Sequence, residues 1–409
     1  MLLELMPKQI KDPVHGYIEV PGELVSLLDS EVVQRLHYIK QLGFAYLVYP
    51  GANHTRFEHS LGAMHLAGQV AKTLDLSKDE TLLVQTAGLL HDIGHGPFSH
   101  ASERLANMFC AFSHDEICRL LESDDEVSKI LEENGTNAKE TADIVAGRHP
   151  LASIIHGDLD VDRMDYLLRD AHYTGVPYGT LDAERLIHSL VNTSEGLAVK
   201  ENGIAAAESL LIARTLMGPS VYYHHVSRIA EEMFLLAGKS VLNAETASEF
   251  IRMNDIEATS YLMHAGSLSH DLMSRIHTRR IYKRAVYASR EMVDMVHFSG
   301  LGAFEKERLH KAICDESGAA PDEVILDIPP VRKEMRMQIQ IANGHFLVSF
   351  EDVAPLLSIM NNVRAGQWRL GVYCPAELKE RVGKAAREIL YVKKPSRQNT
   401  LSDLTAGEL

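Results

Sequence analysis

The residues with the clearest chemical potential lie between positions 89 and 100. An apolar run ends there in the adjacent pair His91-Asp92, and two further histidines, His95 and His100, follow. Imidazole and carboxylate groups together bind borderline divalent cations, and histidines exchange protons near neutral pH. The glycines between them let backbone and substrate approach closely. These residue types in one short segment predict a metal-dependent hydrolase site.

A metal site needs more ligands than one His-Asp pair supplies. His59 lies on the preceding amphipathic segment and Asp162 lies in the acidic segment 157–166. Together with His91 and Asp92 they offer two imidazoles and two carboxylates. This set suits iron, manganese, nickel or zinc, with magnesium as a further candidate, and leaves positions for water and a phosphate oxygen. A lone histidine is more often an ordinary hydrogen-bonded or surface residue, but four matching residues favour the metal site.

Composition restricts the class of protein. Of 409 residues, 45% are hydrophobic and 24% are charged, which is typical of a soluble globular protein. No apolar run reaches the length of a membrane span, and the short N-terminal segment carries an acid and does not read as a signal peptide. Four cysteines without a close CxxC pair indicate reduced thiols in a cytoplasmic protein. The net charge of −15 argues against a nucleic-acid or membrane partner and leaves a small anionic ligand open.

The elements that must position these residues are predicted to be helices. Two capping boxes, Thr55 with Glu58 and Ser77 with Glu80, each open a helix. The first helix carries His59, and the second ends at the His-Asp pair. Helical periodicity continues through most of residues 100–270. The sequence therefore predicts a mainly α-helical catalytic domain.

The pattern changes after about residue 320, where strand signals appear. Asn343-Gly344 is a strong two-residue hairpin signal between two apolar runs. We therefore predict strands at 324–328, 337–341, 345–350 and 368–373, followed by a helix at 375–390. The predicted organisation is a helical catalytic domain (1–270), a helical connector (271–320), a small α+β domain (321–393) and a disordered tail (394–409).

Three segments, 56–62, 91–100 and 160–166, closely resemble motifs of the HD-domain phosphohydrolases, and more narrowly of their deoxynucleoside triphosphate (dNTP) triphosphohydrolase branch. Segments 12–16 and 34–43 extend the resemblance to about residues 8–230. It implies a mainly α fold with a helical HD-domain core and a smaller C-terminal α+β domain. It also implies hydrolysis at the α-phosphorus of a dNTP, which gives a deoxynucleoside and tripolyphosphate. The implied metal ligands are His59, His91, Asp92 and Asp162.

The same resemblance assigns catalytic roles. His95 and His114 are similar to the family's proton-handling and phosphate-contacting histidines, and His100 is similar to a third that contacts phosphate. His114 is followed by Asp115, where the family commonly has glutamate; aspartate is shorter by one methylene. Without the resemblance, His114 would read as a residue at the start of a helix, beside acids that the helix dipole favours.

Substrate contacts follow in the same way. Gln41 and Leu42 resemble the residues that face the sugar 3′-hydroxyl, and Asp170 resembles the acid that receives it. Tyr166 resembles the aromatic under the deoxyribose, whose bulk disfavours a 2′-hydroxyl, and Tyr222 resembles a residue of the sugar pocket. Without the resemblance, Tyr166 would read as a core aromatic. The arginines that would hold the triphosphate with paired hydrogen bonds are Arg56, Arg163 and Arg214.

A second set of residues resembles half of an activator site at an oligomer interface. Asp29 is similar to an acid that reads guanine, but His37 stands where the family has an arginine. Phosphate contacts correspond to Lys8, Arg279 and Lys283. The resemblance implies a nucleoside triphosphate activator and a homo-oligomer, a dimer or tetramer. The alternative is that the basic residues near position 280 form a solvated helix face.

Three other functions stay open or are disfavoured on specific residues. A nucleoside monophosphate phosphohydrolase would use the same metal ligands. A non-catalytic nucleotide sensor is disfavoured because all four ligand positions are intact. A cyclic-dinucleotide phosphodiesterase of the HD-GYP type is disfavoured because such domains usually carry a lysine where His95 stands and because the chain has no Gly-Tyr-Pro motif.

Overall fold

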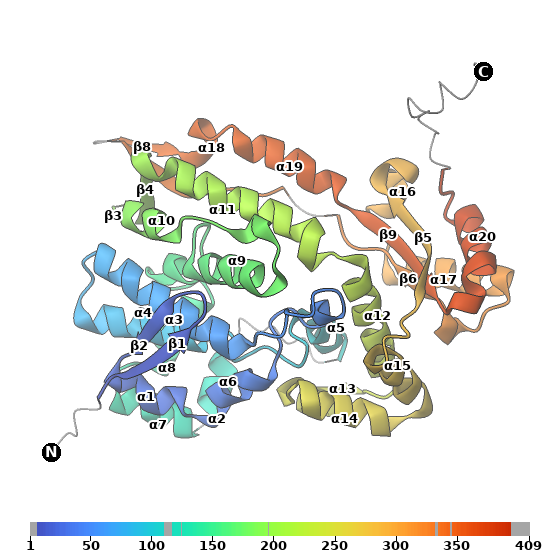
Figure 1. Ribbon diagram of the computed structural model, residues 1–409, viewed down its shortest axis with the longest axis horizontal. Coiled ribbons are helices and arrows are strands. Elements are labelled where there is room, and N and C mark those ends of the chain that lie inside the picture. Colours follow the sequence, from blue (N-terminus) through green and yellow to red (C-terminus); the bar gives the residue numbers. More distant parts are fainter. Residues whose placement is uncertain are drawn as a thin grey trace. The chain divides into compact units, whose positions relative to one another are not determined.

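The computed structural model describes residues 6–109, 117–123, 125–194, 196–331, 334–343 and 346–393. Helices dominate these residues, and the short strands form three small sheets (Figure 1). The predicted fold class, mainly α with a smaller α+β part, is confirmed. The tail predicted to be disordered, 394–409, lies outside the described residues.

The chain divides into two compact units. The first consists of the described residues of Met1–Arg280 and Glu334–Val363, and the second of those of Ile281–Lys333 and Arg364–Leu409. This division differs from the predicted domains, because residues 334–363 of the predicted C-terminal domain belong to the first unit. The predicted connector is not purely helical either, since it contains a strand at Lys283–Ser289.

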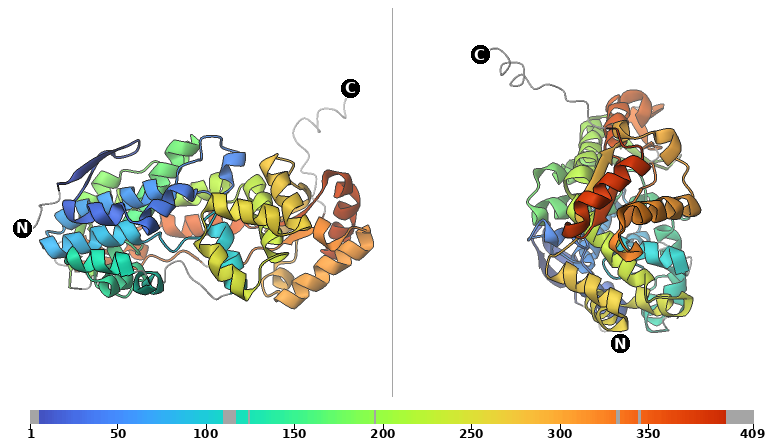
Figure 2. Two further views of the ribbon diagram at one scale, coloured as in Figure 1. Left: turned by 90° about the horizontal axis from the view of Figure 1, so that it is seen from below. Right: turned by 90° about the vertical axis from the view of Figure 1, so that its right-hand side faces the viewer.

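Three long helices form the centre of the first unit. They are α3 (Arg56–Thr73), α4 (Lys78–Leu90) and α9 (Val161–Thr174). Both predicted capping boxes are present at the starts of α3 and α4. α3 packs against α4 and α9, and blue helices lie side by side here in Figure 1 and in the left view of Figure 2. Their shared apolar faces form the core that fixes the positions of His59, His91 and Asp162.

An N-terminal β-hairpin also belongs to the first unit. β1 (Lys8–Asp12) pairs antiparallel with β2 (Gly16–Val20), in a register that places Asp12 opposite Gly16. The turn between them spans residues 13–15, within the segment 12–16 that extends the family resemblance. Gly16 has a φ of +78°, a left-handed conformation that glycine adopts without strain.

A four-stranded sheet completes the first unit and explains the changed boundary. Its order is β3-β4-β7-β8, formed by Leu190–Thr193, Gly196–Lys200, Gln340–Asn343 and Phe346–Ser349. β7 and β8 form the predicted antiparallel hairpin, whose turn residues lie outside the described residues. β7 also pairs in parallel with β4, with Ala198 opposite Gln340. This long-range pairing draws the hairpin into the first unit, and local sequence patterns carry no signal for it.

The other helices of the first unit surround this centre. They are α1 (Gly22–Leu28), α2 (Glu31–Gln34), α5 (His100–Phe109), α6 (Cys118–Ser123), α7 (Asp125–Glu133), α8 (Ala138–Val145), α10 (Ala183–Ser189), α11 (Ile204–Met217), α12 (His225–Lys239), α13 (Ala244–Arg252), α14 (Asp255–Ala265), α15 (Ser267–His277) and α18 (Phe350–Val353). A π-helical turn at Gly218–Tyr222 follows α11. α19 (Leu356–Gly366) begins in the first unit and ends in the second.

The second unit is a small antiparallel sheet with helices. Its strand order is β5-β9-β6, formed by Lys283–Ser289, Arg369–Cys374 and Ile325–Asp327. Helices α17 (Ala303–Ser317) and α20 (Lys379–Ile389) pack on it, and α16 (Met295–Phe298) is a single turn. The predicted strands near 324–328 and 368–373 correspond to β6 and β9. The unit has its own apolar core, in which Val372 and Val382 are fully buried.

Candidate metal centre

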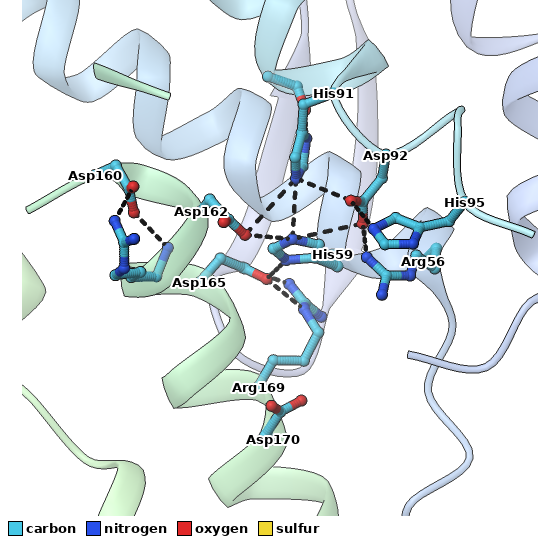
Figure 3. Close-up of polar contacts among 12 residues, drawn as sticks. Arg56, His59, His91, Asp92, His95, Asp160, Asp162, Asp165, Arg169 and Asp170 are labelled. Carbon is cyan, nitrogen blue, oxygen red and sulfur yellow. Dashed lines mark hydrogen bonds and ion pairs between the residues drawn. The ribbon is translucent and has the colours of Figure 1, made fainter. Parts of the chain in front are cut away.

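Helices α3, α4 and α9 each contribute one side chain to a common point (Figure 3). His59 lies in the first turns of α3, His91 is the C-cap of α4, and Asp162 lies in the first turn of α9. The α9 start is fixed by its N-cap Asp160, whose side chain accepts a hydrogen bond from the Arg163 backbone N–H. The first turns of α3 and α9 and the C-terminal end of α4 therefore position these three side chains.

The three side chains converge closely enough to share one cation. His59 Nε2 lies 3.0 Å from Asp162 Oδ1 and 3.1 Å from His91 Nε2. One ligand atom from each of the three lies within 4.8 Å of the others. Asp92 borders the group: its carboxylate lies 3.7 Å from His59 Nε2 and 3.4 Å from His91 Nε2. Two imidazoles with carboxylates are a donor set that fits a divalent transition metal.

Both histidines present Nε2 to the centre because their other ring nitrogens are occupied. His59 Nδ1 donates to Asp165 Oδ2 at 2.7 Å, and His91 Nδ1 donates to the Gly88 carbonyl at 2.8 Å. Such bonds fix the ring orientation and leave Nε2 as the ligand atom. Asp165 and Gly88 were not among the predicted site residues, because their contacts join different elements or involve the backbone.

The charges in the centre are strongly coupled. Burial opposes a charged imidazole at His59, but hydrogen bonds to Asp162 and Asp165 prevail and raise its pKa to about 10. Although burial opposes the charged carboxylate, hydrogen bonds from His59 and His91 lower the pKa of Asp162. The hydrogen bonds to Asp162 and Asp165 therefore favour a protonated His59. A metal ion bound here must displace that proton, so binding is coupled to proton release.

Arg56 is buried against the carboxylate of Asp92, which borders the candidate metal centre. It is 3% exposed, donates to Asp92 Oδ2 at 2.7 Å and donates through Nε to Ser99 Oγ at 2.8 Å. The sequence resemblance predicted a triphosphate contact for Arg56. The structure places its guanidinium on Asp92, where it neutralises the carboxylate.

His95 and His100 share an acidic neighbour that the sequence interpretation missed. His95 Nδ1 lies 3.2 Å and His100 Nδ1 2.8 Å from Glu103 Oε1. The other His95 nitrogen lies 3.3 Å from Asp92 Oδ1. Burial, with the positive charge of Arg56, lowers the pKa of His95 to about 4, so its ring is neutral near pH 7. Glu103 stands one turn into α5, a spacing that could have marked it as a partner of His100.

The predicted dyad His114-Asp115 lies outside the described residues. The structure therefore leaves its roles as predictions.

Several residues that were predicted to contact the sugar lie near the buried carboxylate of Asp170. Asp170 accepts hydrogen bonds from Tyr222 Oη and from His54 Nε2, both at 2.8 Å. The Tyr166 ring neighbours the rings of both His59 and Tyr222, with centroid distances of 6.4 and 6.2 Å. The three rings, which we call the aromatic row, link His59 of the candidate metal centre to Asp170 through the Tyr222 hydroxyl. His54 is another functional candidate that sequence reasoning missed, and its place just before the α3 capping box is the signal that could have marked it.

Gln41 and Leu42 lie at the same part of the first unit. The backbone N–H of Gln41 donates to the His54 carbonyl at 3.0 Å, so Gln41 is tied to an Asp170 partner. Gln41 is 8% exposed, and among the described residues its Oε1 is one of the buried side-chain atoms without a hydrogen-bond partner. Leu42 is half-buried against the apolar core. An unpartnered buried oxygen is costly unless a ligand or water satisfies it.

The other predicted phosphate contacts have protein partners. Arg163 donates to Asp160 and to the Gly157 carbonyl. Arg214 is partly buried, with a guanidinium nitrogen 3.8 Å from the Met335 sulfur. These contacts orient both guanidinium groups.

The residues predicted for an activator have separate local contacts. Lys8 forms an exposed ion pair with Asp29 at 3.1 Å. The His37 ring stacks on Phe57, with centroids 3.6 Å apart, and Arg279 donates to the Leu47 carbonyl. Lys283 lies on β5 in the second unit.

No helix among the described residues combines the length and apolar character needed to cross a membrane.

Comparison with known proteins gives two family matches. Residues 56–170 match the HD domain, and residues 181–401 match the HD associated region. The first match encloses all four candidate metal ligands, and the second covers more than half of the chain.

Individual relatives agree with these matches. The chain is 33% identical over 402 residues to an uncharacterised protein of Methanocaldococcus jannaschii, covering 93% of this chain and 84% of that protein. It is 28% identical over 372 residues to the chicken deoxynucleoside triphosphate triphosphohydrolase SAMHD1, covering 77% of this chain and 59% of that enzyme. A crystal structure of a phosphohydrolase from Bacteroides thetaiotaomicron superimposes with a TM-score of 0.70 at 28% identity, covering 90% of this chain and all of that one.

Proposed function

Since this chain belongs to the HD-domain phosphohydrolases and carries their HD-associated region, we propose that it hydrolyses dNTPs in a metal-dependent reaction that releases a deoxynucleoside and tripolyphosphate. The observation that carries the proposal is the convergence of His59, His91 and Asp162 beside the aromatic row that leads to Asp170. The SAMHD1 relative supports the substrate class, since its name states this activity.

The proposed ligands are His59, His91 and Asp162, with Asp92 as the fourth. A divalent cation held there would acidify water and neutralise charge on phosphate oxygens. Manganese, iron, nickel, zinc and magnesium all remain candidates for the ion, because the donor set accepts each of them.

Proton transfer falls to the histidines beside the ligands. Water attacks the α-phosphorus, the bond to the sugar 5′-oxygen breaks, and that oxygen takes a proton from a histidine. The His114-Asp115 pair is the proposed proton donor. His95, whose ring is neutral near pH 7, is proposed to contact phosphate and accept a proton, and His100 is proposed to contact phosphate. Arg56, Arg163 and Arg214 are the proposed sources of positive charge for the triphosphate. Arg56 would serve through Asp92, where its guanidinium already lies.

Discrimination of the sugar falls to the residues at the other end of the aromatic row. Tyr166 would pack against the deoxyribose and leave no room for a 2′-hydroxyl. Gln41, Leu42, Asp170 and Tyr222 would surround the 3′-hydroxyl. The buried Asp170 carboxylate and the unpartnered Gln41 Oε1 support this role, since either oxygen can accept the one hydrogen bond that a 3′-hydroxyl donates.

Regulation and assembly are proposed from the sequence resemblance. A nucleoside triphosphate would bind at a subunit interface through Lys8, Asp29, His37, Arg279 and Lys283, in a cytoplasmic homo-oligomer. The exposed Lys8–Asp29 pair supports this proposal, because both groups are accessible to a ligand.

A screen of dNTPs, ribonucleotides and nucleoside monophosphates, each with added metal and product identification, tests the proposal. We expect tripolyphosphate and a deoxynucleoside from dNTPs, with loss of activity on chelation. Specificity constants for dATP should exceed those for ATP by about 10⁴-fold, because a site built around one sugar rejects an altered one strongly. Equal constants would defeat the sugar model. Hydrolysis of monophosphates alone would favour a nucleotidase, and no hydrolysis at all would favour a sensor.

A further inference from the structure

A buried carboxylate behind the metal centre joins three parts of the chain. Asp165 on α9 is fully buried. Its Oδ2 accepts from His59 Nδ1 at 2.7 Å and from Arg169 Nε at 2.9 Å. Its Oδ1 accepts from Arg169 Nη2 at 2.9 Å and from His15 Nε2 at 2.6 Å. A carboxylate offers about four acceptor positions, so every one of them is filled. Figure 3 shows the His59 and Arg169 contacts.

The fourth donor comes from the N-terminal hairpin. His15 stands in the turn between β1 and β2, and it reaches α9 from 150 positions away in the chain. Asp12 closes the same turn, since its Oδ1 accepts from the backbone N–H groups of Val14 and His15 at 2.8 Å each. The other Asp12 oxygen accepts from Arg169 Nη1 at 2.8 Å. The turn is therefore bound to α9 at two points.

Helix α3 leaves a specific space for this carboxylate. A Cβ at Gly62 would lie 1.8 Å from Asp165 Oδ1 and 2.6 Å from Arg169 Nη2. Gly62 lies nearly one turn after His59 on the same helix. Any side chain there would push the carboxylate away from His59, so the packing fixes the position of Asp165 from a third side.

We propose that His15 is a positioning residue of the metal centre: the hairpin turn holds Asp165 through His15, and Asp165 aims His59 Nε2 at the cation. Without His15, one acceptor position of a buried carboxylate is empty, and Asp165 can turn about its remaining Arg169 contacts. His59 then loses its fixed partner. This inference rests on the metal site of the proposed function, but not on the substrate.

The test measures Co²⁺ binding to the purified full chain, by chelator competition and by the visible absorption of the bound ion. Loss of a hydrogen-bond partner behind a metal ligand typically weakens metal affinity by about 10–100-fold. We expect that loss for His15→Ala and for His15→Asn, whose amide is too short to reach Asp165. His15→Gln places an amide N–H near the former Nε2, and it should restore affinity to within a few-fold of wild type.

His65→Ala is the matched control. Its ring lies 5.6 Å from that of His15, and its Nε2 contacts Gln69, not Asp165. We expect Co²⁺ affinity and absorption to match wild type. A positioning role requires the Gln variant to differ from the Asn variant, whereas a purely structural role lowers the melting temperature of all His15 variants and leaves their affinities equal.

Wild-type affinity in a folded His15→Ala or His15→Asn variant would overturn the inference. If neither variant folds, His15→Gln decides alone, and a tenfold or greater loss of affinity there would overturn it. Co²⁺ binding without dNTP hydrolysis would refute the proposed substrate and leave this test intact. Absence of Co²⁺ binding to the wild type would refute the metal site and this inference together.

Discussion

Gly62 shows how a single residue without a side chain can determine the chemistry of its neighbours. The Asp165 carboxylate, which accepts a hydrogen bond from His59, fills the space where a Cβ at position 62 would lie. The candidate metal centre therefore requires a residue without a side chain at this position. Helical glycine is otherwise unfavourable by about 1 kcal/mol relative to alanine. The Asp165 contacts offset that cost at this position.

Gly62→Ala should therefore destabilise the protein, by about 1–3 kcal/mol, because overpacking forces a buried ion network apart. Urea unfolding of the metal-free protein measures this loss. Gly68→Ala on the same helix is the control. A Cβ there would meet only the amide end of the Gln85 side chain, which can move. We expect Gly68→Ala to be neutral or stabilising, and equal effects of the two substitutions would contradict the argument.

At the scale of elements, α14 contacts the loop that follows His91-Asp92 and contains Phe98 and Ser99. Phe98 and Ser99 both have left-handed φ angles, +57° and +55°, which are strained for residues other than glycine. Asp255, the first residue of α14, accepts from the Phe98 N–H at 2.6 Å and from the Lys40 N–H at 3.0 Å. Ser99 in turn receives the Arg56 hydrogen bond. A distant helix thus maintains the strained loop beside the metal ligands.

Asp255→Ala should lower the free energy of unfolding by about 1–3 kcal/mol, since it leaves the buried Phe98 N–H without an acceptor. Turnover should fall as well, because the loop that contains Phe98 and Ser99 would leave its strained conformation beside Arg56. Denaturant unfolding and initial rates measure the two effects. Asp271→Ala on α15 removes only an exposed pair with Arg275 and should change stability by less than about 0.5 kcal/mol. An Asp255 variant as stable as the Asp271 variant would disprove the role of α14.

The same scale shows what local sequence can predict. The helices α3 and α4 were predictable from capping boxes and periodicity, and β7 with β8 from Asn343-Gly344. The candidate metal ligands lie in motifs within short segments, so the sequence alone could propose them, and the structure brings His59, His91 and Asp162 together. Asp165 and His15 were not assigned, because each acts through a partner that only tertiary packing brings near. For the same reason, the β4–β7 pairing and the two-unit division were not predictable from local patterns. Glu103 was missed although its spacing of three residues from His100 on one helix is a local signal.

At the scale of the whole molecule, the exposed Lys8–Asp29 pair bears on assembly. A cation and an acid that are 46% and 57% exposed gain little from each other in water. They are available to bind a nucleotide, and binding that favours an oligomer shifts the distribution by mass action.

Light scattering should therefore show a larger mean mass when a nucleoside triphosphate is added to the protein. Lys8→Ala should weaken this response. Lys11→Ala is the matched control, because Lys11 lies on the same strand but contacts the Tyr17 ring. A protein that stays monomeric with every nucleotide, at full activity, would refute the interface site. A mass increase that both lysine variants retain would place the nucleotide elsewhere.

The parallel pairing of β4 with β7 has a consequence for how the protein is made. Synthesis proceeds from the N-terminus, and domains that are continuous in sequence can fold as they leave the ribosome. Here β4 leaves the ribosome long before β7, and the strands and helices from Ile281 onward emerge between them. The unit that carries the candidate metal centre therefore completes its sheet only after residues 281–333 of the second unit have been made. A nascent chain that stalls in the second unit would hold every candidate metal ligand and still display an unpaired strand edge, which is a target for chaperones and a risk for aggregation.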